Sequence, residues 1–226
     1  MNFIKDPKFY EYSLYAGFIP MYNTINLIFK GKPWKKEYTL LKIHKKRAVL
    51  FFEDLVIHKT TKKKSQKYIL TIDKDFNSVF EKTNSYHIKK NNFCWFSESL
   101  KNAISSLIKK SKKLASFHSI ELWNKNTGEI VAGDIGVVIG SRYLSMTGFY
   151  SENGSGSVLL VFLGKVLQKL GIKAWDLGMD LPYKRDLGAK LLQKNTFLEI
   201  VEKTRNQKIN FKIDRYEYSD FLKDIK

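Results

Sequence analysis

The sequence contains one cysteine, Cys94, among its 226 residues. An intramolecular disulfide is therefore excluded, which suits a reducing compartment. No apolar run approaches the roughly 20 residues that a membrane-spanning helix needs, and residues 1–6 lack the charged and apolar regions of a secretory signal. With 43% hydrophobic and 14% aromatic residues, the chain has the composition of a folded protein. We therefore expect a soluble, cytoplasmic protein without membrane contact.

Arginine is scarce, since it supplies only five of the 40 basic residues, and the formal net charge is +18. Residues 1–118 carry 24 basic and 9 acidic side chains, whereas residues 119–226 carry 16 and 13. Clustered lysines bind polyanions because contacts with phosphates release counterions. An A-rich genome would produce the same excess of lysine. The charge alone leaves both explanations open.

The most regular part of the sequence lies between residues 131 and 190. Apolar runs rich in β-branched and aromatic residues predict strands at residues 135–139 and 143–149. A glycine–serine loop at residues 151–157 opens onto apolar residues with helical spacing, and a glycine ends this helix. Residues 173–177 then predict a short strand. A ligand site at this junction is our first hypothesis.

The glycine–serine loop provides Ser155, Gly156 and Ser157 at the expected start of the helix. Free backbone N–H groups in such a place attract phosphate, although an ordinary helix cap is the alternative. Strand, strand, glycine turn, helix and strand is the order of a GNAT-type acyltransferase core. We therefore expect an α+β fold, in which a GNAT-like domain with a mixed central sheet flanked by helices covers residues 43–226. A small irregular N-terminal unit would cover residues 1–42.

Other segments predict further strands. Residues 48–58 predict two short strands joined by a tight turn, and residues 68–72 and 119–123 predict one strand each. Residues 209–213 alternate like a late strand.

No metal site is indicated. The histidines are scattered, and the sequence has neither a cysteine pair nor a helical His-Glu spacing. The four histidines are His44, His58, His87 and His118. No serine carries the nucleophile-elbow signature that would support a Ser-His-Asp triad.

Several segments resemble, in order and spacing, the leucyl/phenylalanyl-tRNA protein transferase family. They are residues 17–20, 47–50, 118–123, 158–162, 175–176 and 187–189, with Trp95 placed before the central helix. The resemblance covers about residues 14–200. It implies a GNAT-like enzyme that takes Leu, Phe or Met from aminoacyl-tRNA and joins it to the basic N-terminal residue of a protein, which creates a degradation signal. It implies no metal and no dissociable cofactor.

From the resemblance we expect Asp176 to act in the chemical step, by positioning the attacking amine. The alternative is a structural role, in which its carboxylate caps backbone N–H groups of the turn from Gly178 to Asp180. We expect Trp95 to stack on the terminal adenine of the tRNA acceptor arm. The remaining expected substrate-binding residues are Met146, Phe149, Trp175, Gly178, Ser155, Gly156 and Ser157. Two lysine patches are expected to bind tRNA: Lys62, Lys63, Lys64 and Lys67, and then Lys109, Lys110, Lys112 and Lys113.

The sequence departs from the family at the proposed chemical centre. The typical bacterial pattern is Asp-x-Gln, but here Gly178 follows Asp176 and Leu177, and no acidic residue stands near Ser145. These versions resemble the plant and protist branch of the family. Two alternatives therefore stay open: a CoA-dependent N-acetyltransferase, and a non-catalytic tRNA-binding descendant. We expect a monomer.

Overall fold

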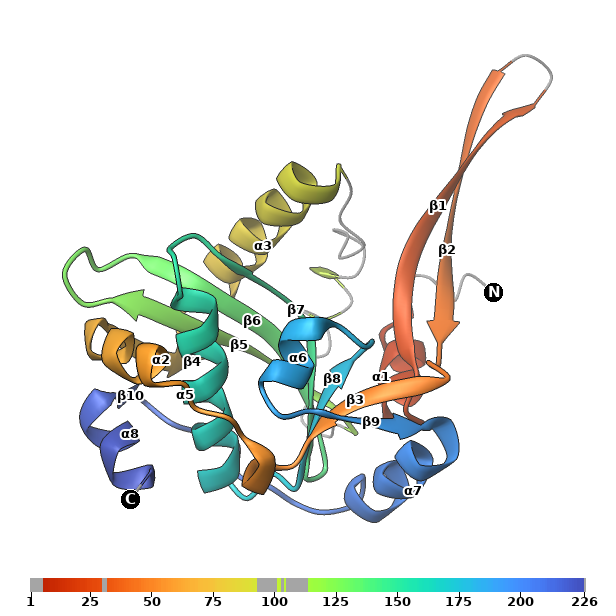
Figure 1. Ribbon diagram of the computed structural model, residues 1–226. Coiled ribbons are helices and arrows are strands. Elements are labelled where there is room, and N and C mark those ends of the chain that lie inside the picture. Colours follow the sequence, from red (N-terminus) through yellow and green to blue (C-terminus); the bar gives the residue numbers. More distant parts are fainter. Residues whose placement is uncertain (1–5, 30–31, 93–100, 103, 105–113, 226) are drawn as a thin grey trace.

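The main body of the protein is an eight-stranded mixed sheet. The computed structural model describes residues 6–29, 32–92, 101–102, 104 and 114–225. The strand order of the eight-stranded sheet is β10-β4-β5-β6-β7-β8-β3-β9. Only β7 and β8 pair in parallel; the other neighbours are antiparallel. Helices cover both faces (Figure 1). The predicted α+β fold, with a mixed central sheet flanked by helices, is confirmed.

The elements follow one another along the whole described chain. The strands of the main sheet are β3 (Lys46–Leu50), β4 (Tyr68–Ile72), β5 (Ser116–Asn124), β6 (Ile130–Ile139), β7 (Arg142–Tyr150), β8 (Ala174–Gly178), β9 (Lys190–Gln193) and β10 (Tyr216–Glu217). The helices are α1 (Pro7–Tyr15), α2 (Lys59–Lys64), α3 (Phe76–Asn91), α5 (Ser155–Lys169), α6 (Pro182–Asp186), α7 (Lys194–Thr204) and α8 (Tyr218–Asp224). A separate two-stranded sheet contains β1 (Ile19–Phe29) and β2 (Lys32–Lys42).

The predicted central unit forms as β6, β7, α5 and β8. Its strand, strand, helix and strand are all confirmed. Gly154 precedes α5 with a φ of 85°, and Gly171 follows the helix with a φ of 82°. Both glycines therefore occupy the left-handed region, where side chains are disfavoured. The helix carries the chain across the sheet, so β8 lies parallel to β7, as such a crossover requires.

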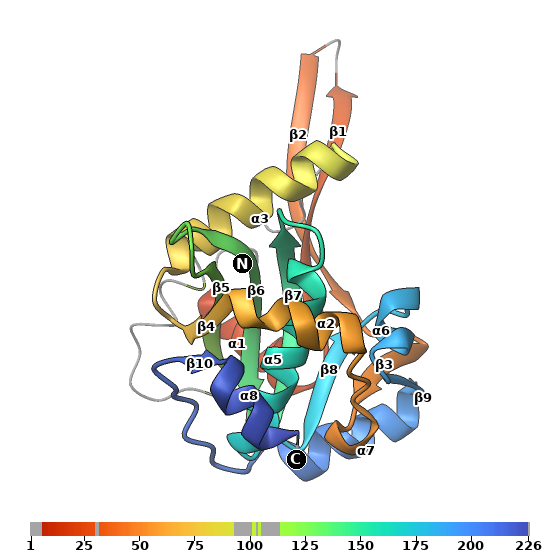
Figure 2. The same cartoon turned by 60° about the vertical axis from the view of Figure 1, so that its left-hand side comes forward.

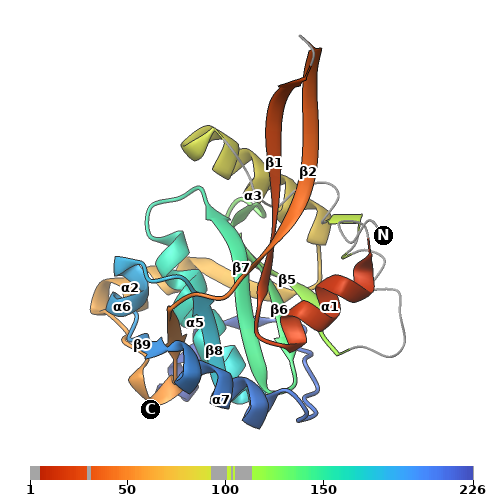
Figure 3. The ribbon, with the colours of Figure 1, turned by 90° about the vertical axis from the view of Figure 1, so that its right-hand side faces the viewer.

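Side chains alternate between the two faces of the sheet. Within the described residues they build two large core clusters and a smaller third one that includes Val49 and Phe197. Tyr143 and Trp175 lie in the cluster beneath α5, which covers this face together with α2 and α8 (Figure 2). Leu14 of α1, Phe80 of α3 and Phe149 of β7 belong to the second cluster. Figure 3 shows α1 and α5 on opposite sides of β7. The central strands are therefore buried on both faces.

The N-terminal unit is regular, so the prediction of an irregular unit is wrong. α1 packs into the second core cluster through Tyr10 and Leu14, and β1 and β2 form a hairpin that projects from the body (Figures 1 and 3). Pro20 and Pro33 are residues of the kind that forms turns. Both lie in a two-stranded ribbon, whose strands are edges and tolerate proline. The division at residues 42 and 43 stays a prediction.

Two predicted strands do not form. Beyond Phe52, the segment after β3 makes a 3-10 turn and then an extended connection, in which the backbone N–H of Val56 donates to Leu187. Residues 209–213 form no strand either. Ile209 and Phe211 alternate because they pack against the α5-side core as an irregular segment. The alternation of apolar residues thus reflects burial of every second side chain. No strand forms, because in the part of the chain that the structure describes the segment does not pair with a neighbouring strand by backbone hydrogen bonds.

No helix within the described ranges combines the length and the apolar composition needed to cross a bilayer.

Candidate active site

The parallel strands β7 and β8 separate partway along their length. They pair only over residues 142–144 and 174–176. Beyond this point β7 continues beside β6, while Gly178 of β8 pairs with Ala48 of β3. We call the place where they part, from Ser145 on β7 and Leu177 on β8 onward, the fork. Backbone groups that lose a strand partner need another one, so the fork is a natural place for a ligand.

Asp176 lies at the base of the fork and is completely buried. Its Oδ1 accepts hydrogen bonds from Arg47 Nε at 2.7 Å and from the Gly178 N–H at 3.0 Å. Its Oδ2 accepts from Arg47 Nη2 at 2.8 Å and from Arg142 Nη1 at 2.9 Å. A carboxylate has about four lone-pair sites, so these donors saturate it. Asp176 therefore has no free lone-pair site with which to bind and position the attacking amine directly.

The two arginines are as buried as the carboxylate that joins them. Arg142 also donates to the carbonyl oxygen of Leu14, which ties α1 to the fork. The ring of Phe197 on α7 lies 4.6 Å from the Arg47 guanidinium carbon. Arg47 Nη1 and Arg142 Nε have no hydrogen-bond partner among the described residues. One carboxylate thus holds two guanidinium groups, and the cluster carries an excess positive charge.

The charges of this cluster determine the ionisation of its members. Burial alone would raise the pKa of the Asp176 carboxyl, but the charges and hydrogen bonds of Arg47 and Arg142 outweigh burial and hold that pKa below its ordinary value. Burial, together with the positive charges of Arg47 and Lys42, lowers the pKa of nearby His44 to about 4. His44 is therefore neutral at pH 7. Burial is the largest cause of this shift, and the positive charges of Arg47 and Lys42 add to it.

A second buried carboxylate, Asp134 on β6, lies across the fork. Its Oδ2 accepts from Tyr143 Oη at 2.8 Å and from Ser145 Oγ at 3.0 Å. Ser145 in turn accepts from Trp175 Nε1 at 3.0 Å. A Cβ on Gly136 would lie 2.1 Å from the Tyr143 hydroxyl, so only glycine lets Tyr143 reach this carboxylate. An acidic side chain from the adjacent strand thus lies beside Ser145 in the folded protein.

Asp134 should make stability depend on pH. Burial raises the pKa of Asp134 to about 7 despite the hydrogen bonds of Tyr143 and Ser145. The pKa of Asp134 in the folded protein exceeds its ordinary value of 3.8, so protonated Asp134 contributes to the free energy of unfolding. This contribution is fully present below pH 3.8 and is lost as the pH rises to about 7. Asp134→Asn cannot ionise. Relative to the parent, it should gain up to about 4 kcal/mol between pH 4 and pH 8.

Urea unfolding of both proteins at the two pH values measures this gain. Asp180→Asn, which changes an exposed carboxylate, is the control. If the free energy of unfolding depends on pH equally in the parent and in Asp134→Asn, the pKa of Asp134 is not raised in the folded protein.

Lys184 of α6 places an ammonium group beside Gly178. Its Nζ donates to the carbonyl oxygens of Leu177 and of Met179, the latter at 3.0 Å. Only 6% of the residue is exposed. Burial lowers the pKa of Lys184 to about 8, with Asp176 opposing the change. Lys184 could not be predicted as a site residue, because the five residues of α6 are too few to show a helical period.

The glycine–serine loop lies at the open end of the fork, since Tyr150 at the end of β7 leads directly into it. Ser155 Oγ donates to the carbonyl oxygens of Val131 and Glu152, so it does not cap the helix. The N–H groups of Gly156 and Ser157 precede the first intrahelical hydrogen bond, which runs from Val158. Such groups remain available to an anion.

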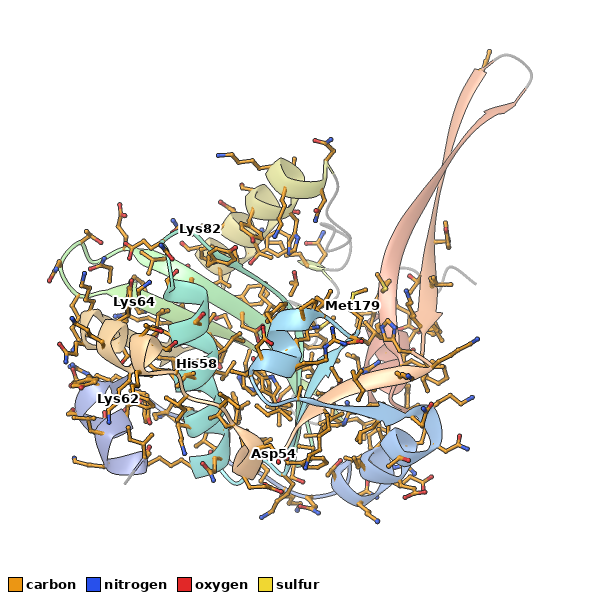
Figure 4. All side chains as sticks on the ribbon, in the orientation of Figure 1. Asp54, His58, Lys62, Lys64, Lys82 and Met179 are labelled. Atoms are coloured by element: carbon orange, nitrogen blue, oxygen red, sulfur yellow. The ribbon has the colours of Figure 1, made fainter. Side chains whose placement is uncertain are left out.

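The first predicted lysine patch adjoins this loop. Lys64 Nζ lies 3.4 Å from the carbonyl oxygen of Asn153, and a Cβ on Gly154 would lie 2.7 Å from the same ammonium group. Figure 4 shows Lys64 on α2 beside the N-terminal end of α5. Lys62, Lys63 and Lys67 are exposed. Two separately predicted features, the lysine patch and the loop, thus meet at one end of the molecule.

Exposed aromatic side chains surround the fork. Tyr150 is 49% exposed and Tyr183 is 51% exposed. The ring of Tyr86 on α3 lies 5.4 Å from that of Tyr150. Met179, visible beside α6 in Figure 4, is 49% exposed. Large exposed apolar side chains that gather in one place mark a binding surface.

The remaining predicted residues are divided between the two faces. Met146 and Phe149 pack in the second core cluster, whereas Trp175 packs in the cluster beneath α5. The structure therefore does not bring these three side chains into one cluster, and their common role stays a prediction. Gly178 has a φ of 77°, and a Cβ there would lie 3.7 Å from Ile19, its nearest contact in the described part of the chain apart from its chain neighbours. Trp95 and the second lysine patch, Lys109, Lys110, Lys112 and Lys113, lie outside the described residues.

In the described part of the chain, no three side chains of His, Cys, Asp or Glu gather in a way that could hold a metal ion.

Comparison with known proteins gives one consistent result. The family model described as "Leucyl/phenylalanyl-tRNA protein transferase" matches residues 49–202, which is more than half of the chain. The chain is 27% identical over 158 residues to the leucyl/phenylalanyl-tRNA–protein transferase of Hydrogenovibrio crunogenus, covering 69% of this chain and 59% of that protein. It is 24% identical over 175 residues to the transferase of Legionella pneumophila, covering 74% of each.

A Shewanella transferase (strain W3-18-1) is 26% identical over 147 residues, covering 65% of this chain and 59% of that protein. The chain thus spans about 59% of the length of the Hydrogenovibrio and Shewanella relatives. The match includes β7, α5, β8 and the fork.

Proposed function

Because the chain belongs to the leucyl/phenylalanyl-tRNA protein transferase family, we propose that it transfers an apolar amino acid from aminoacyl-tRNA to the N-terminal amine of a protein. The donors are Leu-, Phe- or Met-tRNA, and the acceptor carries a basic N-terminal residue. The product is a new peptide bond and a degradation signal. The observation that carries the proposal is a fork with a buried, positively charged base. Asp176 and Arg142 lie inside the matched residues, and Arg47 lies two residues before them.

The positive potential suits the chemistry of this transfer. The neutral α-amine of the acceptor attacks the ester carbonyl of the aminoacyl-tRNA, and negative charge develops on the carbonyl oxygen. Arg47 and Arg142, only partly balanced by Asp176, favour that charge. The same positive charge lowers the pKa of an amine nearby, as the charge of Arg47 does for His44 in addition to burial. A larger share of the acceptor is then neutral and able to attack at pH 7.

Asp176 serves this chemistry as a positioning residue. Its carboxylate is saturated by Arg47, Arg142 and Gly178, so it fixes the two guanidinium groups and the end of β8. The chemical step needs Asp176 because the arginines depend on it for orientation. Direct proton transfer to Asp176 is not part of the proposal.

The donor tRNA reaches the fork from its open end. The lysine patch of Lys62, Lys63, Lys64 and Lys67 contacts phosphates of the acceptor arm, and the N–H groups of Gly156 and Ser157 receive another phosphate oxygen. The apolar side chain of the amino acid meets the exposed surface formed by Tyr150, Met179 and Tyr183. Trp95 stacks on the terminal adenine, which is worth roughly 1 to 3 kcal/mol. Trp95→Ala should weaken binding of an aminoacyl-adenosine analogue accordingly.

The protein acts as a cytoplasmic monomer without a dissociable cofactor. A CoA-dependent N-acetyltransferase is the second candidate, because the glycine–serine loop would equally accept a pyrophosphate. A non-catalytic tRNA-binding descendant is the third, because Gly178 stands where the family carries glutamine.

One paired assay separates the three candidates. The purified protein is incubated with an Arg-initiated peptide and either radiolabelled Leu- or Phe-tRNA or radiolabelled acetyl-CoA. A Met-initiated peptide is the acceptor control. We expect the Arg-initiated peptide to become labelled with radiolabelled Leu- or Phe-tRNA and to stay unlabelled with radiolabelled acetyl-CoA. Label from acetyl-CoA would favour the acetyltransferase, and tRNA binding without any labelled peptide would favour the non-catalytic descendant.

A further inference from the structure

The end of β8 lacks a donor side chain at Gly178 and has an ammonium group beside it. Lys184 reaches from α6 to the carbonyl oxygens of Leu177 and Met179, the residues on either side of Gly178. Among the described residues other than its two chain neighbours, a Cβ on Gly178 would meet one atom within 4 Å, at 3.7 Å. The strand end therefore combines open space at position 178 with a fixed cation next to it.

A buried ammonium group is costly unless its N–H bonds are paired. Among the described residues, only the two carbonyl oxygens accept hydrogen bonds from Lys184 Nζ. The ring of Tyr183 lies 5.6 Å from the nitrogen. Two N–H bonds are thus used to fix the direction of the group, and the third is left for another acceptor.

We propose that Lys184 donates its third N–H bond to the ester carbonyl oxygen of the aminoacyl-tRNA and so takes the place of the donor side chain that Gly178 lacks. This inference rests on the proposed function. It assigns Lys184 a catalytic role, since the ammonium group touches the reacting oxygen.

The step needs no other reactant. The acceptor amine attacks the carbonyl carbon, and the π electrons of the C=O bond move to the oxygen beside Lys184. The intermediate collapses, the bond from carbon to the ribose oxygen breaks, and the amine loses a proton as the ribose oxygen gains one. Lys184 stays protonated and stabilises the oxyanion through its hydrogen bond.

The protonated form of Lys184 is therefore the active one. Burial lowers the pKa of Lys184 to about 8, so deprotonation falls within an accessible range. The charged and titratable groups that face Lys184 are Asp176 of β8, Arg47 of β3, Asp134 of β6, Asp180 before α6, Tyr183 on α6 and His44. The rate should rise while the acceptor amine loses its proton and fall above pH 8 as Lys184 loses its own.

Three variants test the proposal. Lys184→Met removes the charge, Lys184→Arg keeps a cation that does not titrate in this range, and Arg185→Met removes a half-exposed cation from the same helix as a matched control. Single-turnover transfer from Phe-tRNA is measured from pH 6 to pH 10. Affinity for an amide-linked phenylalanyl-adenosine and the unfolding midpoint are measured in parallel.

Lys184→Met should lower the transfer rate about 100- to 1,000-fold, as loss of one oxyanion donor does, with the affinity changed less than about threefold. Lys184→Arg should transfer at a tenth of the parent rate or faster, and its transfer rate should no longer fall above pH 8. Arg185→Met should match the parent.

Several results would overturn the proposal. Transfer by folded Lys184→Met within about threefold of the parent would do so, while leaving the proposed function intact. If Lys184→Met fails to fold, the pH profile of Lys184→Arg decides, and an unchanged fall above pH 8 removes Lys184 from the step. If the parent transfers nothing from Leu-, Phe- or Met-tRNA, the proposed function and this inference fall together.

Discussion

Asp176→Asn is expected to lower the free energy of unfolding by about 3 to 5 kcal/mol, the range for breaking a buried ion pair from one side. The carboxylate oxygens accept four hydrogen bonds, from Arg47 twice, from Arg142 and from the Gly178 N–H. An asparagine amide turns one acceptor into an NH2 group, which would face donors. Two buried guanidinium groups would also lose their counter-charge. Both effects act in the same direction.

Urea unfolding at pH 7 measures the loss, and the melting temperature should fall by roughly 6 to 20 °C. Asp180→Asn is the matched control, because Asp180 is exposed and its pair with Arg185 spans 3.4 Å at the surface. The free energy of unfolding of Asp180→Asn should differ from that of the parent by less than about 1 kcal/mol. If Asp176→Asn unfolds with the parent's midpoint, the cluster does not hold the base of the fork.

Replacing Lys62, Lys63, Lys64 and Lys67 with glutamine should flatten the salt dependence of tRNA binding. Each phosphate contact contributes about 0.7 to 0.9 to the slope of log affinity against log salt, so four contacts amount to about 3 units. The patch lies next to the glycine–serine loop. The effect should appear equally with charged and uncharged tRNA, because phosphate contacts carry no information about the amino acid.

A variant with the same change in net charge provides the control. Lys169, Lys194, Lys203 and Lys208 are exposed and lie near the opposite end of α5 or on and after α7. Their replacement with glutamine should leave the slope within about one unit of the parent. Equal slopes for the patch variant and the parent would place the tRNA elsewhere. Equal flattening in both variants would mean that only net charge matters.

The fold around the fork could be predicted because its signals are local. Runs of β-branched residues, a glycine-rich turn and an apolar helical stripe defined β6, β7, α5 and β8 without knowledge of their neighbours. Alternation of apolar residues predicted a strand wrongly where those residues are buried without belonging to a sheet. Ile209 and Phe211 alternate like a strand, but Phe211 stacks on Tyr143 at 5.6 Å as part of an irregular segment.

The candidate site was predicted only in part, because its partners come from distant parts of the chain. Asp176 stood out as a charge inside an apolar strand, but Arg47 is 129 residues away and Arg142 is 34 residues away. A usable signal did exist. Both arginines precede apolar strand residues in a chain with only five arginines, and a buried arginine needs an anion. Asp134 and Lys184 gave no such signal, since pairing across the sheet and a five-residue helix bring them to the fork.

The most direct test of the account is whether an aminoacyl group binds at the fork. The chain has four tryptophans, so a protein labelled with ¹⁵N at the indole nitrogen gives few signals, which Trp→Phe variants assign. Trp175 Nε1 donates to Ser145 at the fork, whereas Trp123 Nε1 donates to Thr71 on strands separated from β7 by β6. On titration with amide-linked phenylalanyl-adenosine, the Trp175 signal should shift progressively to saturation and the Trp123 signal should stay in place. An unmoved Trp175 signal, at a concentration where the analogue demonstrably binds, would contradict the assignment of the fork as the site of transfer.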